Sequence, residues 1–262
     1  SGPQAAGRGF TNLAYASMRT LSAASLAETE RLGGAMSGAV AFIALGKAGS
    51  GEMTAGSDLD LMTVYDAPPE AISEKKRWAA DVFYVRFTQR LISALSAHTG
   101  EGGLYDVDMR LRPSGSKGPV SVRLSGFDAY YGQEAATWEF MALTRARVVW
   151  ASDPSFGAAT TKAIEEALRR PRPGIDVAAE VRAMRDLMAR ERRPDGFWDL
   201  KLASGGLVDA EFVGQFRQLQ SAAVGEALTV STLAQLARDM PLREAWKVQQ
   251  GLAQLLACAF DD

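Results

Sequence analysis

Two aspartates, Asp58 and Asp60, stand one residue apart at the start of the apolar stretch 61–65. If that stretch is a β-strand, the two carboxylates lie on the same face, about 6–7 Å apart. Carboxylates at that spacing repel each other unless a cation lies between them. The preceding segment, 46–57, is rich in glycine and serine, and such a flexible backbone can offer N–H groups to phosphate oxygens. The pattern therefore indicates a divalent metal together with a phosphate group.

A third carboxylate is expected from a neighbouring strand, because a two-metal phosphoryl-transfer site needs more than two acids. In residues 104–112 apolar and polar side chains alternate, which predicts a strand with one polar face. Asp108, and by the same parity Asp106, can complete the cage. Arg110 and Arg112 share that face and could bind a triphosphate through forked hydrogen bonds. The alternative is a sheet edge whose polar residues simply face water.

The composition excludes several classes of protein and site. The 262 residues are 47% hydrophobic and 23% charged, as expected of a soluble protein with a large core. No apolar run is long enough to span a bilayer, and the net charge of −2 argues against a nucleic-acid partner. Cys258 is the only cysteine and His98 the only histidine. Zinc sites built on cysteine are therefore excluded, the remaining carboxylates favour Mg²⁺ or Mn²⁺, and a reducing cytoplasm is the expected location.

The two single residues and the N-terminus carry further expectations. Cys258, among leucines and a phenylalanine, is predicted to be a core residue, and His98 a capping or surface residue. The start Ser-Gly-Pro lacks both an initiator methionine and the regions of a signal peptide, which predicts a piece of a longer protein.

Competing catalytic and phosphate-binding motifs fail on spacing. A P-loop would require glycine and serine or threonine where Ala41 and Ala48 stand, and the glycines at 46, 49 and 51 do not follow the dinucleotide fingerprint. Ser50 lacks the flanking pattern of a hydrolase nucleophile, and a single histidine makes a catalytic triad improbable.

Hydrophobic patterning predicts an α+β fold in which strands and helices are followed by helices alone. Strands are expected near 40–45, 58–65, 104–112 and 120–124. Helices are expected at 13–32, 75–97, 127–133, 135–149, 160–169, 177–190, 207–220, 229–239 and 243–259. In the helix at 75–97, the side chains of Trp78, Val82, Val85 and Leu91 are predicted to face inward. The turn at Asp153-Pro154 predicts a boundary between an α+β domain, 1–152, and a helical domain, 153–262.

Two other segments have more than one interpretation. Asp209 and Glu211 open a predicted helix, where the helix dipole alone favours acids, but they could also face an active site. Arg145 and Arg147 are two residues apart on a predicted helix and so point in different directions, which leaves open which one faces a nucleotide.

Four ordered motifs between residues 40 and 220 resemble the glutamine-synthetase adenylyltransferase family of the DNA polymerase β-like nucleotidyltransferase superfamily. They are LGK…GSDLDL (45–61), VDMRLRPSG (107–115), TWE…ALTRARVV (137–149) and GGLVDAEF (205–212). One departure is Gly49-Ser50, where the family usually has two glycines. The family's enzymes carry an adenylylating half and an adenylyl-removing half, and Arg-Pro-Ser-Gly and Thr-Trp-Glu are similar to the adenylylating half.

The resemblance implies a polymerase β-like domain with a mixed sheet, followed by an all-helical domain. It implies transfer of AMP from ATP to a tyrosine hydroxyl of glutamine synthetase, with control by a PII signalling protein and a role in nitrogen metabolism. Asp58, Asp60 and Asp108 would hold two Mg²⁺ or Mn²⁺ ions, and Asp108 would bridge the hydroxyl's metal or act as its base. The implied phosphate contacts are Gly49, Ser50, Ser57, Lys47, Arg110 and Arg112. The alternatives are the phosphorolytic removal of AMP, an inactive regulatory domain, and an RNA nucleotidyltransferase, which the acidic balance disfavours.

Overall fold

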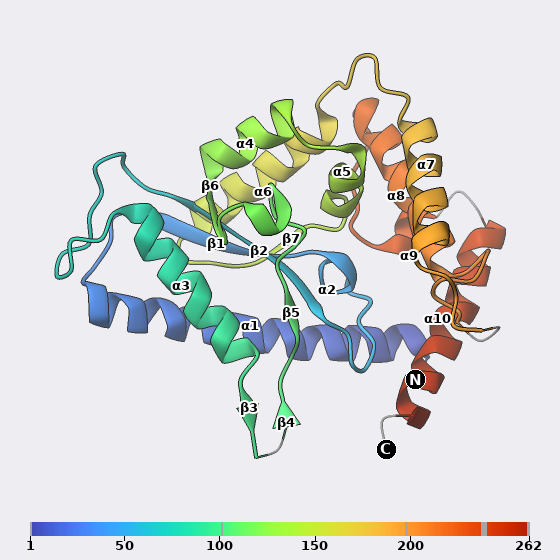
Figure 1. Ribbon diagram of the computed structural model, residues 1–262, viewed down its shortest axis with the longest axis horizontal. Coiled ribbons are helices and arrows are strands. Elements are labelled where there is room, and N and C mark those ends of the chain that lie inside the picture. The colour runs from blue at the N-terminus through green and yellow to red at the C-terminus, as the bar shows by residue number, and fades with distance from the viewer. Residues whose placement is uncertain (1, 101, 197–198, 237–239, 261–262) are drawn as a thin grey trace.

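The computed structural model describes residues 2–100, 102–196, 199–236 and 240–260 (Figure 1). The strands are β1 (Ala39–Ala44), β2 (Leu59–Asp66), β3 (His98–Thr99), β4 (Gly102–Gly103), β5 (Val107–Asp108), β6 (Ser121–Arg123) and β7 (Arg147–Ala151). The helices are α1 (Pro3–Gly33), α2 (Gly46–Ser50), α3 (Ala80–Leu95), α4 (Leu124–Gln133), α5 (Thr137–Leu143), α6 (Pro154–Arg169), α7 (Val177–Glu191), α8 (Leu207–Ala223), α9 (Thr232–Gln235) and α10 (Met240–Phe260). None of the described helices has the length and apolar character needed to cross a bilayer.

A mixed five-stranded sheet organises the molecule, which confirms the predicted α+β class and the mixed sheet. β1 lies between β2 and β7 and is antiparallel to both. β2 is parallel to two short strands, first β5 and then β6. A separate hairpin, β3–β4, was not predicted and projects from the body beyond α1 (Figure 1).

The sheet is buried on both faces, which explains the continuous apolar run at 40–45. Val40, Phe42 and Ala44 pack with α1 and α3 on one face. Ala41 and Ile43 pack with α4, α5, α6 and α8 on the other face. Figure 1 shows the long α1 and α3 on one side of the sheet and α4 and α6 on the other.

Two predicted elements near the site are wrong. The predicted strand 104–112 forms ladder pairs only at β5, because the chain turns back after Asp108: the Arg112 amide donates to the Met109 carbonyl, and the Gly115 amide to the Arg112 carbonyl. The predicted helix 135–149 is instead α5 followed by β7. In the run Arg-Val-Val-Trp-Ala of β7, β-branched and aromatic residues favour an edge strand over a helix.

Other elements keep their type but change their limits. α1 begins ten residues earlier than predicted and α3 five residues later. The inward face of α3 is formed by Phe83, Tyr84, Phe87 and Leu91, so the prediction that Val82 faces inward is wrong; it is 39% exposed. Part of the predicted glycine-rich loop forms the short helix α2.

Beyond β7, the described residues form helices and turns and no strand. α6 packs on β1 and β7 within the sheet core, and α8 joins the same cluster. The predicted boundary at 152/153 therefore precedes a helix that belongs to the sheet's own core. Residues 237–239 of the predicted helix 229–239, and the side chain of Cys258, lie outside what the structure describes.

Candidate active site

Asp60 and Asp108 lie side by side on neighbouring strands. β2 and β5 run parallel, with Leu59 opposite Val107 and Asp60 opposite Asp108. Asp58 directly precedes β2, and the amide of Leu59 donates to the carbonyl of Asp106 at 2.8 Å. In-register residues of paired strands point to the same face. The sheet thus brings the three predicted carboxylates to one end of β2 and β5.

Asp60 is the most strongly perturbed of these acids. Burial, followed by the charges of Asp108 and Asp58, raises the pKa of the Asp60 carboxyl from 3.8 to about 6. Lys201 and Arg145 oppose this rise. A carboxylate that is half-buried beside two others carries unfavourable charge repulsion, which is the condition that a bound cation relieves.

Asp108 instead directs its carboxylate to Arg110. The Nε of Arg110 donates to both carboxylate oxygens at 2.8 and 3.0 Å, and the Arg110 amide donates to the same group at 2.7 Å. These bonds hold the pKa of Asp108 below its usual value. The Arg110 side chain is 73% exposed, so this pair is weakly stabilising. Within the described residues, no three histidine, cysteine or acidic side chains are grouped as ligands of one metal ion.

The three aspartate side chains are nevertheless of the chemical type that binds a hard divalent cation. All three side chains offer oxygen ligands, which Mg²⁺ and Mn²⁺ prefer. Such an ion would offset both the burial of the Asp60 carboxylate and its repulsion by Asp108 and Asp58, which together raise its pKa. Asp108 would have to leave Arg110 to contribute its oxygens.

The glycines next to the acids allow close backbone packing. Gly46 has φ +51°, and a Cβ there would lie 2.2 Å from Oδ2 of Asp60. A Cβ at Gly49 would lie 1.9 Å from the carbonyl oxygen of Arg145. Any larger residue at either position would therefore displace the chain from Asp60 or from Arg145.

Ser50 and Ser57, two predicted phosphate contacts, are placed differently. Ser50 is buried and its hydroxyl donates to the Lys47 carbonyl at 3.3 Å. Ser57 accepts from the Thr54 amide at 2.9 Å and bonds the Thr54 hydroxyl at 2.8 Å, which fixes the turn that leads into Asp58. Ser57 therefore lies beside the acids, and Ser50 faces the interior.

Arg112 holds the loop that follows β5. It is buried, and its guanidinium donates to the carbonyls of Met109, Gly118 and Pro119 at 2.7 to 3.2 Å. The expectation that Arg110 and Arg112 project together from one strand face is wrong, because the strand ends at Asp108.

The cations near the acids come from three distant segments. Burial lowers the pKa of the Lys47 ammonium, and the negative charges of Glu211 and Asp58 partly offset this decrease. Arg145 is buried, pairs with Glu211 at 3.4 Å and donates to Thr232 at 2.9 Å. Its Nε is buried without an acceptor among the described residues. A buried donor of this kind is available to an anionic ligand.

Arg145, rather than Arg147, is therefore the arginine that faces the acids, since Arg147 donates to the carbonyl of Gly49. Glu211 faces the site through its pair with Arg145, whereas Asp209 pairs with Arg185. Lys201 was not predicted, because it lies in an irregular segment with no periodic or motif signal.

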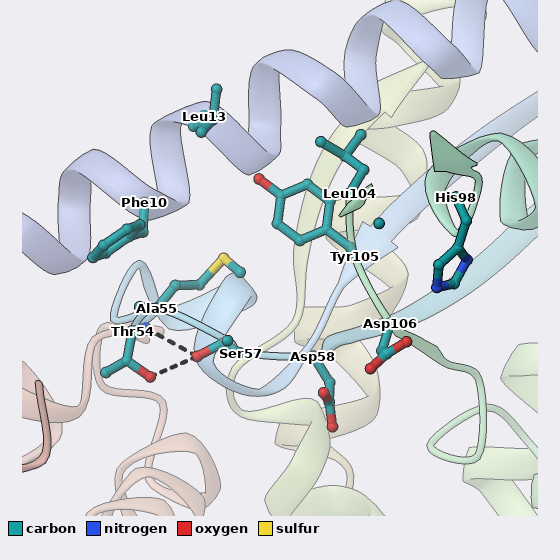
Figure 2. Close-up of a pocket in the computed structure, with 13 residues that line it drawn as sticks. Phe10, Leu13, Thr54, Ala55, Ser57, Asp58, His98, Leu104, Tyr105 and Asp106 are labelled. Atoms are coloured by element: carbon teal, nitrogen blue, oxygen red, sulfur yellow. Dashed lines mark hydrogen bonds between the residues drawn. The ribbon is translucent and has the colours of Figure 1, made fainter. Parts of the chain in front are cut away.

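Two cavities adjoin this centre. One, about 220 Å³, is lined by Gly46 and Arg145 and by apolar side chains of α5, α7 and α8, among them Trp138, Met141, Met188 and Phe212. The other, about 460 Å³, lies between α1, residues 53–58 and residues 103–106, and Asp58 and Asp106 lie at one side of it (Figure 2). His98, on the exposed β3, also lines it, in agreement with the predicted surface position.

Comparison with known proteins identifies the family. Residues 8–163 match the family described as glutamate-ammonia ligase adenylyltransferase. A bifunctional glutamine synthetase adenylyltransferase/adenylyl-removing enzyme of Caulobacter vibrioides is 55% identical over 98% of this chain and 27% of the relative. Proteins of the same name are 48% identical in Brucella suis, over 82% of this chain and 22% of theirs, and 40% identical in Xanthobacter autotrophicus, over 98% and 27%.

These similarities define a class, the adenylyltransferases. Within it, the chain belongs to the glutamate-ammonia ligase adenylyltransferase family, which confirms the resemblance inferred from the four motifs. The chain spans about a quarter of the length of the curated relatives that it matches.

Proposed function

We propose that this chain is a nucleotidyltransferase that moves AMP from ATP to a tyrosine hydroxyl of glutamine synthetase and releases pyrophosphate. The single observation that carries the proposal is the in-register pair Asp60–Asp108, with Asp58 beside it, in a chain of the adenylyltransferase family. The direction of transfer rests on the Arg-Pro-Ser-Gly and Thr-Trp-Glu motifs, which are similar to those of the adenylylating half.

The site offers separate places for the parts of ATP. The apolar cavity that reaches Gly46 and Arg145 suits a purine base, since its walls include an aromatic ring and methionines. Lys47 and Arg145, with Lys201 nearby, supply positive charge for phosphates, and the unpaired Nε of Arg145 is a ready donor. This arrangement supports nucleotide binding between α2 and the helices that follow the sheet.

Asp58, Asp60 and Asp108 would hold Mg²⁺ or Mn²⁺, whose charge neutralises the triphosphate when bound. The chain's own residues set the conditions for transfer. Arg110 lowers the pKa of Asp108, so Asp108 can accept the hydroxyl proton only after its hydrogen bonds with the Arg110 guanidinium break. Gly46 keeps the backbone against Asp60 and fixes that carboxylate in place.

The direct test is to incubate the chain with ATP, Mg²⁺ and unmodified glutamine synthetase, and then to look for an AMP added to a tyrosine of the synthetase by mass spectrometry. Wild-type chain should modify it, and Asp60→Asn should not. A parallel reaction of AMP-modified synthetase with phosphate tests the reverse activity: ADP release without forward transfer would reassign the direction. Failure of both reactions, with no metal-dependent ATP binding by calorimetry, would indicate an inactive domain. Control by a PII protein and a cytoplasmic location stay predictions.

A further inference from the structure

The larger cavity beside Asp58 has an apolar wall that faces solvent. We call it the α1 groove, and Figure 2 shows Phe10 and Leu13 on α1 across from Asp58 and Asp106. Leu13 is 60% exposed and Leu104 46% exposed. Exposed large apolar side chains gathered around one cavity are typical of a surface that another molecule covers.

The charge of the groove is wrong for a nucleotide. Its thirteen lining residues, all within the described part of the chain, include Asp58 and Asp106 but no lysine or arginine. A triphosphate placed there would be repelled. The positive charges of the site act from other segments: Lys47 from α2, Arg145 from the turn between α5 and β7, and Lys201 from the segment before α8.

Asp58 lies at the edge of the groove and also interacts electrostatically with Asp60 and Lys47. The groove thus reaches one of the three carboxylates at which transfer is proposed to occur. A group that enters the groove therefore reaches Asp58 through a cavity that has acidic but no basic lining residues, whereas the smaller cavity contains Arg145. A neutral hydroxyl on an apolar ring fits both features, because the wall buries the ring and the carboxylate of Asp58 accepts a hydrogen bond from the hydroxyl.

We propose that the α1 groove binds the tyrosine-bearing segment of the acceptor protein, with apolar residues of that segment against Leu13 and Leu104 and the tyrosine hydroxyl directed to Asp58. This inference rests on the proposed adenylyl transfer and adds to it the surface that selects the acceptor. The nucleotide and the acceptor then approach the carboxylates from two different cavities.

The test uses Leu13→Glu and Leu104→Glu, each an exposed position whose change leaves the core intact. A buried carboxylate in the apolar contact should raise KM for glutamine synthetase about ten-fold, which corresponds to ~1.4 kcal/mol, while the Kd for Mg·ATP by calorimetry stays within two-fold. Leu187→Glu, on the 42% exposed Leu187 of α7 away from the groove, is the matched control and should change neither value. Leu13→Met should retain the wild-type KM.

A second measurement reports contact directly. A photo-crosslinking amino acid at position 104 should join the chain to the synthetase segment that contains the modified tyrosine, and the same group at position 187 should not. Unchanged KM in both variants, or a crosslink to a remote surface of the synthetase, would overturn the acceptor assignment while leaving the adenylyl transfer intact. A self-association of the chain that Leu13→Glu abolishes would also overturn it, by assigning the groove to a second copy. Absence of transfer by the wild-type chain would instead reject the proposed function.

Discussion

Replacing Asp60 by asparagine should stabilise the metal-free protein although it removes one of the three proposed metal ligands. Burial and the neighbouring Asp108 and Asp58 raise the pKa of the Asp60 carboxyl from 3.8 to about 6. The gap between those two values corresponds to an upper limit of ~3 kcal/mol of unfavourable free energy when Asp60 is ionised. Asparagine has nearly the same shape and no charge, but its amide must also be desolvated. We expect a gain in the free energy of unfolding of about 1–2 kcal/mol.

The sign of the pH dependence follows from the same numbers. The folded state of the wild type holds the Asp60 proton more tightly than the unfolded state does. Protonation of Asp60 therefore makes its full favourable contribution to the free energy of unfolding below pH 3.8. It is lost as the pH rises through about 6. Urea unfolding in the presence of a chelator should therefore show that Asp60→Asn gains most over wild type at pH 7.5 and least at pH 4.

Addition of Mg²⁺ should reverse the order of the two proteins. A cation bound by the carboxylates stabilises the wild type by mass action and leaves Asp60→Asn nearly unchanged. Asp106→Asn, at an exposed position on the segment that leads into β5, is the control and should change stability by less than about 0.5 kcal/mol. An Asp60→Asn protein that is less stable than wild type at pH 7.5 without metal would refute the charge repulsion on which the site is built.

Three further changes test the supports of the site. Arg112→Met should destabilise the fold by about 2–4 kcal/mol, because it removes a buried guanidinium that donates to the carbonyls of Gly118 and Pro119 and leaves the Met109 carbonyl with only the backbone amide of residue 112; Arg110→Met, at an exposed position, should cost less than about 1 kcal/mol in the same urea titration. Gly49→Ala should lower the free energy of unfolding by about 3 kcal/mol or prevent folding, since its Cβ would lie 1.9 Å from the Arg145 carbonyl oxygen. A Cβ at Gly56 meets no atom within 4 Å, so Gly56→Ala should lower the free energy of unfolding only by the ~1 kcal/mol that its positive φ costs. Glu52→Ala should lower the melting temperature by removing the acceptor of the Thr232 amide and hydroxyl; an unchanged melting temperature would show that α9 is held by other contacts.

The sequence predicted that the three acids lie together, because the pattern that places them is local. Asp58 and Asp60 adjoin a strongly apolar strand, and the position of Asp108 followed from one neighbouring segment. The limits of that segment could not be predicted, because the alternation in 104–112 continues past the point where β5 loses its partner. The predicted helix 135–149 extends into β7, because the strand preference of a run of only five residues takes effect once the edge of β1 supplies hydrogen bonds. Arg112 looked like a ligand contact from its spacing, and only the loop that folds back onto it shows why it is buried.

The positive charges of the site depend on tertiary contacts that no window of sequence contains. Arg145 reaches the acids because Gly49 allows the backbone before β7 to pack on α2, and because Thr232 and Glu211, from α9 and α8, hold its guanidinium. Glu52, which follows α2, binds the same Thr232. The glycine-rich segment, β7 and the late helices thus meet through a few buried polar contacts. A change in the placement of α8 and α9 would therefore alter Arg145 before it altered the acids, so nucleotide affinity should respond to perturbation of these helices more strongly than the fold of the sheet does.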